Sequence, residues 1–314
     1  MARELRYRLL GPLKVECAEE QIRLTGSRQR VLLAMLLLEA NQVMSIDRLI
    51  AAVWSEDPPV SAKSQIRICV SELRRKFAAK GCGEVIETHS SGYLLRVDEG
   101  ALDLHRFQDL VERGRAAAAN GRLVEAVRLL RSALDLWRGR LAVGLESDLL
   151  AAAAVKVTED RYVVVEEYID LNLRLGRQRE IIGELNCYVA DAPFRENLCA
   201  QLMLALHLSG RRAEALEFYR TVRKRFADEL GIEPGESLRK TEIFVLTNES
   251  GTLPTGHRLR LGAHPATDRI VPDTRAETEH RLTRLESEIV RLRAEYHAFV
   301  AAAKTPDTSP IGRQ

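Results

Sequence analysis

A short motif recurs three times in the middle of this 314-residue sequence and limits how that region can fold. Each copy starts with Gly-Arg and has a glutamate four residues after the glycine, and the copies begin at Gly121, Gly176 and Gly210. The last two copies lie 34 residues apart, a spacing typical of repeated helix pairs. The first copy lies 55 residues before the second, so we expect an insertion between them. Because residues 101–246 are rich in Ala, Leu, Arg and Glu and poor in Gly and Pro, we expect them to be almost wholly helical.

The first hundred residues have a different pattern, in which short strand signals surround three helical segments. Alternation of apolar and polar residues predicts the strands. Ser45 is a suitable N-cap with Asp47 in the first helical turn, and two consecutive prolines separate the second helix from the third. The expected elements are strands at 5–10, 13–17 and 21–24, helices at 28–39, 46–54 and 61–79, and strands at 85–88 and 93–97.

The expected helix at 61–79 has an apolar face and a basic face. Between residues 61 and 80 there are six basic residues and one acid, against a net charge of only +2 for the whole chain. Ile66 lies at the centre of the apolar face, and three further apolar side chains fall within about 40° of it around the helix axis, namely Val70, Leu73 and Phe77. The other face carries Lys63, Ser64, Arg67, Ser71, Arg74 and Arg75.

The basic face has the chemistry that DNA recognition requires. Arginine and lysine neutralise phosphates, arginine can bind guanine through two hydrogen bonds, and small hydroxyl side chains permit close approach. Taken alone, the helix is equally well explained as a solvated amphipathic helix. A short helix, a loop, a basic helix and a hairpin form the order of a winged helix-turn-helix, and this context favours DNA. We expect Arg67 to contact a base, Arg74 and Arg75 to contact phosphates, and the wing-tip residues Ser90 and Ser91 to approach DNA.

The loop between the two helices of this motif is longer than a minimal turn. It either spaces the helices or touches a protein partner, and its acids, which phosphate would repel, favour the partner. We expect Trp54 to lie in the core beneath this loop. The residues expected to face the partner are Ser55, Glu56, Asp57, Pro58 and Pro59.

Composition and motifs argue against an enzyme, a metal centre and a membrane protein. The seven histidines are scattered, and neither a GxxxxGK[ST] loop nor a GxSxG turn is present, so we expect no catalytic residue, metal or cofactor. The five cysteines have no CxxC pair and no regular spacing, which argues against a secreted disulfide framework and favours a reducing, cytoplasmic location. The longest uncharged apolar run, 31–38, is far shorter than the roughly 20 residues that span a membrane, and no signal-peptide core follows Met1.

The sequence after residue 246 has three parts. Residues 247–274 contain Pro, Gly and Thr and are expected to form a linker. Residues 275–303 carry apolar side chains at alternating steps of three and four, which predicts a heptad helix. This helix either pairs with a second chain, the slightly favoured alternative, or folds onto the helical region. Residues 304–314 are expected to be a disordered tail.

Two sets of segments carry a resemblance to a known family, together covering about residues 5–246. Those at 7–15, 28–38, 47–54, 70–75 and 91–95 resemble the N-terminal part of the Streptomyces antibiotic regulatory proteins. Those at 102–107, 134–139, 202–206, 210–216 and 228–235 are similar to the bacterial transcriptional activator domain of the same family, and include Gly-Arg-Arg-Ala-Glu-Ala-Leu and Asp-Glu-Leu-Gly-Ile-Glu-Pro-Gly.

The resemblance implies a mainly α protein with a small β component. An OmpR-type winged helix-turn-helix at 1–100 would be followed by a tetratricopeptide-like all-α domain at 101–246. The C-terminal helix expected from the heptad spacing lies beyond the segments that carry the resemblance. The recognition helix would be 61–79 and the wing 84–97. Leu94 stands where the family's wing usually carries an arginine, which puts a basic wing contact in doubt.

The resemblance further implies a transcriptional activator of a secondary-metabolite, or antibiotic, gene cluster. Such a protein binds tandem direct repeats in double-stranded DNA near the −35 element, as a homodimer of side-by-side protomers. It recruits RNA polymerase with its sigma factor, through a loop that matches 55–60 here. Two alternatives stay open, a helical adaptor that binds a protein or peptide, and a ligand-sensing regulator that acts through the helical region.

Overall fold

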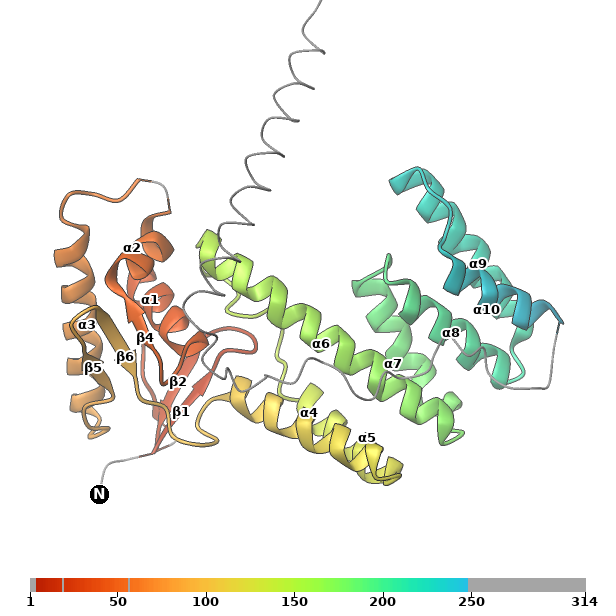
Figure 1. Cartoon of the computed structure of the whole chain (residues 1–314), viewed down its shortest axis with the longest axis horizontal. Coiled ribbons are helices and arrows are strands. Elements are labelled where there is room, and N and C mark those ends of the chain that lie inside the picture. Colours follow the sequence, from red (N-terminus) through yellow and green to blue (C-terminus); the bar gives the residue numbers. More distant parts are fainter. Residues whose placement is uncertain (1–3, 19, 56, 248–314) are drawn as a thin grey trace, which may run out of the picture. The chain divides into compact units, whose positions relative to one another are not determined.

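The computed structural model of this chain describes residues 4–18, 20–55 and 57–247. Beyond its first residue the expected linker (247–274) lies outside the described residues, as do the expected heptad helix (275–303) and tail (304–314). Figure 1 shows two small sheets in the first hundred residues and helices after them. This confirms the prediction of a mainly α fold with a small β component and an N-terminal winged helix-turn-helix.

The first sheet is formed by β1 (Leu5–Arg8), β2 (Lys14–Cys17) and β3 (Glu20–Gln21), in antiparallel order β1-β2-β3. Along β1 buried and exposed side chains alternate, as the apolar pattern predicts. The expected third strand at 21–24 is wrong in its bounds, because β3 covers residues 20 and 21, with one further hydrogen bond from the Ile22 N–H to the Val15 carbonyl at 2.8 Å. Alternation continues after Gln21, but register with β2 decides where pairing stops.

The second sheet has the order β4-β6-β5 and contains one strand that the apolar pattern does not predict. This strand is β4 (Val43–Ser45), which pairs with β6 (Gly92–Leu95), and β6 pairs in turn with β5 (Ile86–Thr88). Gly92 is needed at the crossing with β4, because a Cβ atom there would lie 1.8 Å from the Met44 carbonyl oxygen. The wing is therefore joined to the strand that leads into the second helix.

Three helices complete the N-terminal region, within one residue of the expected bounds. They are α1 (Ser27–Leu38), α2 (Ile46–Trp54) and α3 (Ala62–Ala79). Every side chain of α1 from residue 31 to residue 37 is buried. The predicted cap is confirmed, since the Ser45 hydroxyl accepts a hydrogen bond from the Arg48 N–H at 3.2 Å.

The three Gly-Arg motifs mark the turns of three helix pairs, as the repeat predicts. The pairs are α4 (Asp103–Ala119) with α5 (Leu123–Leu134), α6 (Asp148–Arg174) with α7 (Gln178–Asp191), and α8 (Glu196–Leu208) with α9 (Arg212–Arg225). Gly121, Gly176 and Gly210 have φ angles of 73°, 73° and 82°, the left-handed conformation that ends helices. The expected insertion consists of residues 135–147 and the unusually long α6. A π-helical turn, η1 (Phe226–Leu230), and α10 (Glu236–Thr247) end the described chain.

A cluster of hydrogen bonds joins β1 to the first helix pair. The buried carboxylate of Asp103 accepts from the backbone N–H groups of Leu9 at 2.7 Å and Leu10 at 3.1 Å. Arg138 lies 3.4 Å from the same carboxylate, and its backbone N–H donates to the Leu10 carbonyl at 2.8 Å. Burial raises the pKa of Asp103, while these donors act in the opposite direction. Because α6 also packs against α1 and α2, one hydrophobic core extends through both regions.

One disulfide links Cys17 on β2 to Cys82, which follows α3. The cysteine spacing did not predict this pair, because 65 residues separate the partners and they meet only after folding. A single bridge is far from the dense framework that the spacing argues against. Of the remaining cysteines Cys69 and Cys199 are buried and Cys187 is exposed.

Candidate nucleic-acid interface

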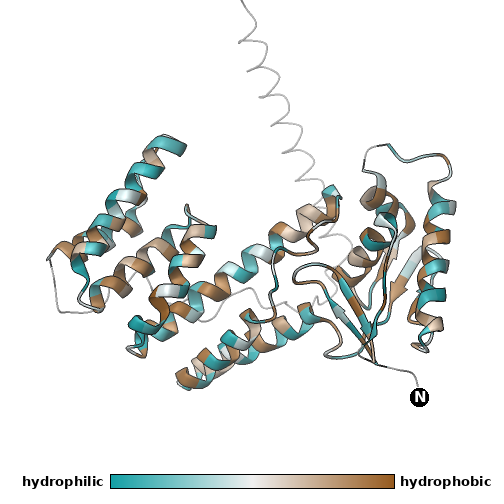
Figure 2. Ribbon diagram, turned by 180° about the vertical axis from the view of Figure 1, so that it is seen from behind, coloured by the Kyte–Doolittle hydropathy of each residue, from teal (hydrophilic) through white to brown (hydrophobic). Residues whose placement is uncertain are grey.

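Helix α3 is anchored by the apolar stripe that its sequence predicts. Ile66, Val70, Leu73 and Phe77 are all buried. Figure 2 shows the helix with alternating hydrophobic and hydrophilic bands, as a one-sided apolar stripe requires. The N-terminus of α3 follows directly from the proline loop, since the Ala62 N–H donates to the Pro59 carbonyl at 2.8 Å. The opposite face of α3 is therefore held outward.

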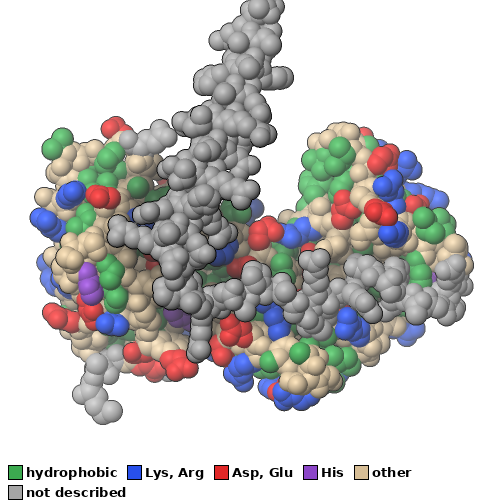
Figure 3. Space-filling view, viewed as in Figure 1, with side chains coloured by type: hydrophobic (Ala, Val, Ile, Leu, Met, Phe, Trp, Pro, Cys, Tyr) green, Lys and Arg blue, Asp and Glu red, His purple; other side chains and the backbone are tan. Residues whose placement is uncertain are grey.

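Five of the six side chains expected to face DNA are exposed on that outward face, namely Lys63, Ser64, Arg67, Ser71 and Arg75. Arg67 and Arg75 make no ion pair or hydrogen bond with any described residue. Lys63 lies 3.7 Å from Asp47, in a pair that is exposed on both sides. Lysine and arginine side chains lie along the edge of the molecule that α3 forms (Figure 3). We call these five residues the α3 face.

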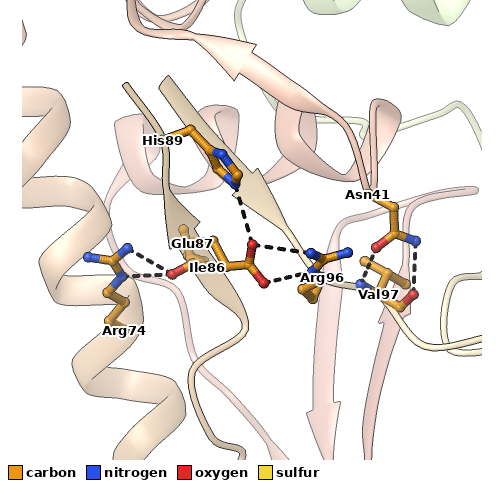
Figure 4. Close-up of polar contacts among 7 residues, drawn as sticks. All are labelled: Asn41, Arg74, Ile86, Glu87, His89, Arg96 and Val97. Carbon is orange, nitrogen blue, oxygen red and sulfur yellow. Dashed lines mark hydrogen bonds and ion pairs between the residues drawn. The ribbon is translucent and has the colours of Figure 1, made fainter. Parts of the chain in front are cut away.

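Arg74, the sixth expected residue, is partly buried and points to the wing. Its guanidinium donates to the Ile86 carbonyl from Nε at 3.0 Å and from Nη2 at 2.8 Å, as Figure 4 shows. Nη2 also donates to the Thr88 hydroxyl at 2.7 Å. Arg74 therefore connects α3 to β5, and in this structure its donors bind the wing. Charge counting along the helix could not distinguish it from its neighbour Arg75.

The wing tip is polar, and its base carries an ion pair (Figure 4). Ser90 and Ser91 are exposed between the two strands, as predicted. Glu87 accepts from Arg96 at 2.7 Å and lies 3.3 Å from the His89 ring, and the hydrogen bond from Arg96 lowers the pKa of Glu87. Leu94, which stands at the family's arginine position, is buried.

Two residues near the positions expected to face DNA were not among the predicted set. Arg96 is exposed two residues after Leu94 and places a cation at the base of the wing. Ile68 is 57% exposed although it is apolar, and it lies beside Arg67 and Ser71 on α3. A helical projection places Ile68 opposite Ile66, at about 200°, so periodicity offered a signal for this residue. An apolar side chain in this position is suited to contact with a thymine methyl group.

The loop between α2 and α3 is exposed at every described residue. These are Ser55, Asp57, Pro58, Pro59 and Val60, whereas Glu56 lies outside the described residues. Val60 is fully exposed, which adds an apolar side chain to the predicted set. The expectation that Trp54 lies in the core is wrong, because its side chain is only partly buried at the edge of the core. Its half-buried indole faces solvent on one side and has the Arg28 guanidinium 5.2 Å from the ring centroid.

The described residues also bear on whether the chain could hold a metal ion or span a membrane. No group of three or more His, Cys, Asp or Glu side chains there is arranged to hold a metal ion. None of the described helices is long and apolar enough to cross a membrane.

Comparison with known proteins gives matches over both regions. Residues 19–95 match the family "Transcriptional regulatory protein, C terminal", and residues 102–246 match "Bacterial transcriptional activator domain". The chain is 32% identical to the regulatory protein DnrI of Streptomyces peucetius over 255 residues, which are 79% of this chain and 94% of DnrI. It is 39% identical to the regulatory protein AfsR of Streptomyces coelicolor over 77% of this chain, but it spans only 24% of AfsR.

A solved structure supports the fold. The structure of Mycobacterium tuberculosis EmbR in complex with a low affinity phosphopeptide matches with a TM-score of 0.75 and 33% identity. The match covers 80% of this chain and 67% of the EmbR chain.

Proposed function

The chain belongs to the Streptomyces antibiotic regulatory protein family of transcriptional regulators, and from this premise we propose that it activates transcription of a secondary-metabolite gene cluster. Two named relatives, DnrI and AfsR, are regulatory proteins of Streptomyces. The proposed contact with DNA is made by α3 in the major groove, with the wing beside it.

The observation that carries this proposal is the state of the cations on the α3 face. Arg67 and Arg75 are exposed and have no partner among the described residues, while the opposite side of α3 is anchored in the core. A cation that has no carboxylate partner is available to phosphate or to a base edge.

Each residue of the face has a role in the proposal. Arg67 reads a base, because it lies midway along the exposed stripe, and Ser64 and Ser71 permit close approach. Lys63 and Arg75 contact phosphates. Arg74 acts indirectly by holding the wing, whose tip residues Ser90 and Ser91 reach the DNA backbone.

We propose tandem direct repeats as the DNA target, occupied by two side-by-side protomers near a −35 element. Selection from a promoter library with purified full-length protein, followed by footprinting, tests this. Protection of two direct repeats about one helical turn apart is the expected result. A protected palindrome would indicate a symmetric dimer and refute the tandem arrangement, and no enrichment of any fragment would refute DNA binding.

The α2–α3 loop is proposed to touch RNA polymerase with its sigma factor. Its exposed acid, prolines and Val60 lie next to the α3 face and carry no cation toward DNA. We expect Val60→Asp to leave footprints unchanged and to reduce transcription in a reconstituted assay with polymerase. Val124→Asp is the control, since Val124 is a valine on α5 that is also exposed, although less than Val60. Equal transcription by the two variants would refute the polymerase contact.

The proposal includes a cytoplasmic location, where DNA and polymerase are found, and it requires no cofactor and no catalysis. It also keeps the division at residue 100, with a DNA-binding domain at 1–100 and an activator domain at 101–246.

A further inference from the structure

A cavity of about 790 Å³ lies within the helical region, away from the α3 face. One wall is the segment 137–145 that follows α5, and the other is the N-terminal half of α6. Its lining includes apolar side chains such as Leu145 and Ala154, together with the aromatic rings of Trp137 and Tyr162. The volume falls within the range of roughly 300–1,000 Å³ that holds small ligands.

Two buried N–H donors at this cavity have no hydrogen-bond acceptor among the described residues. They are Nε1 of Trp137 and Nε of Arg161. The two side chains stack, with the Arg161 guanidinium 4.9 Å from the Trp137 ring centroid, and Phe107 packs edge-on against the same ring. A buried donor without an acceptor is costly, and an indole N–H and a guanidinium can only donate. Both groups therefore favour a ligand that brings acceptor atoms.

The charges of the lining show which kind of acceptor fits. Glu159 is neutralised by an ion pair with Arg195, whose guanidinium also lies 4.2 Å from the Tyr162 ring centroid. Arg140 and Arg161 make no ion pair with any described residue. Asp191 is the remaining acid of the lining, and it is exposed at the end of α7. Two unpaired arginines beside two aromatic rings are suited to a negatively charged, planar molecule.

We propose that this cavity binds an anionic aromatic small molecule, with its ring system beside Trp137 and its acidic group toward Arg161 and Arg140. The wall formed by the segment 137–145 connects such a ligand to the N-terminal region. Within the segment 137–145, the backbone N–H of Arg138 donates to the Leu10 carbonyl, and that of Ala142 donates to the Leu9 carbonyl at 3.1 Å. The ligand would contact the same segment that holds β1 in place, and this regulatory part rests on the proposed function.

The binding test uses 1-anilinonaphthalene-8-sulfonate, an anionic aromatic probe, with the full chain. The protein has two tryptophans, so Trp54→Phe leaves Trp137 as the only indole reporter. We expect saturable binding of one probe per chain with quenching of Trp137 fluorescence. Arg161→Gln should weaken probe binding by about tenfold or more, and Arg140→Gln by about threefold. The matched control is Arg179→Gln, an exposed arginine on α7 outside the lining, which should bind as the parent does.

Two further measurements distinguish recognition of the anionic group from non-specific hydrophobic binding and from misfolding of the variants. The neutral probe N-phenyl-1-naphthylamine should bind Arg161→Gln and the parent about equally, because it has no anion for Arg161 to recognise. Ala154→Trp, which places an indole ring among the lining residues, should weaken the binding of both probes while the helical circular-dichroism signal is kept. Unchanged affinity for the anionic probe in Arg161→Gln and Arg140→Gln, or in Ala154→Trp, would overturn the proposal.

The regulatory part is tested by DNA affinity with and without saturating anionic probe. We expect a change of about threefold or more, since coupling energies between sites are commonly of this size or larger. A probe that binds through Arg161 without any effect on DNA affinity would overturn the regulatory part. Absence of DNA binding before the probe is added would instead refute the proposed function, and the probe titration would stand independently.

Discussion

Helices α3 and α9 carry the same number of cations and use them differently. Each contains five lysines and arginines, with one acid on α3 and two on α9. On α9 most of the cations have carboxylate partners, such as Arg220 with Glu217 at 3.1 Å and Arg223 with Glu233 at 2.7 Å. On α3, Arg67 has no partner among the described residues.

The comparison shows that the number of charges does not identify a DNA-binding helix. A paired arginine must give up its carboxylate before it can bind phosphate, whereas an unpaired one exchanges only water. The position within the fold adds to this difference, since α3 is the second helix of a helix-turn-helix and α9 is the second helix of a repeat. Substitutions on both helices therefore test whether the pairing of cations separates α3 from α9 in DNA binding.

The largest effect is expected for Arg67. Arg67→Ala should weaken binding to a selected DNA site by about 1–3 kcal/mol, roughly 5- to 150-fold, because a base contact is lost. Arg220→Ala on α9 should leave the same affinity unchanged. Fluorescence anisotropy on the selected site and on random DNA measures both. Equal losses on the two DNAs would remove the base contact from the proposal, and a similar loss for Arg220→Ala would break the comparison.

The next effect is on stability and concerns Arg74, a cation of α3 whose guanidinium is hydrogen-bonded within the fold. Arg74→Met removes two partly buried hydrogen bonds to the Ile86 carbonyl and an exposed one to the Thr88 hydroxyl, so we expect unfolding in urea to become easier by about 1–2 kcal/mol. Arg75→Met is the matched control, with no change in stability expected because Arg75 is exposed and unpaired. If both variants unfold alike, Arg74 does not hold the wing.

A smaller effect is expected for Arg75 in DNA binding. Arg75→Ala should weaken specific and random DNA by the same factor, because a phosphate contact carries no sequence information. The slope of log affinity against log salt concentration should fall by about 0.9 for the one phosphate contact removed. A change in base preference, or an unchanged salt slope, would show that Arg75 does not bind a phosphate.

The smallest effect is expected for the α9 pair, and it depends on pH. The hydrogen bond from Arg223 lowers the pKa of Glu233 below the ordinary glutamate value. A lowered pKa means that the ionised carboxylate stabilises the folded state above that ordinary value, and that this stabilisation disappears as pH falls through the lowered pKa. Wild type should therefore have a slightly higher Tm than Arg223→Ala at pH 7, with the two values converging at low pH. A Tm difference that does not change with pH would point to packing of the arginine stem instead.

Much of the secondary structure could be predicted from local patterns. The helices α1 to α3 start and end within a residue of their predicted bounds, and the buried stripe of α3 is the predicted one. The three glycine turns were predicted by the repeat. Each of these features depends on residues within about one or two helical turns of one another, through periodicity, capping or a glycine in the left-handed region.

The features that the sequence did not predict depend instead on contacts between residues that are distant in the sequence. Strand β4 exists because Val43–Ser45 lies along β6, and Cys17 meets Cys82 across 65 residues. Trp54 lies at the edge of the core because the packing around it leaves one side of the indole open. A three-residue strand or a single cysteine carries too little local information to show its partner.

The order of helices, strands and turns, and the family to which the chain belongs, follow from local patterns and motifs that the amino-acid sequence displays directly. The chemical state of each charged group does not. Arg74 and Arg75 are adjacent and identical in type, yet one binds the Ile86 carbonyl and the other is exposed. The physical reason is that an ion pair or hydrogen bond requires two groups within about 3–4 Å. Folding sets that distance between segments that are far apart along the chain.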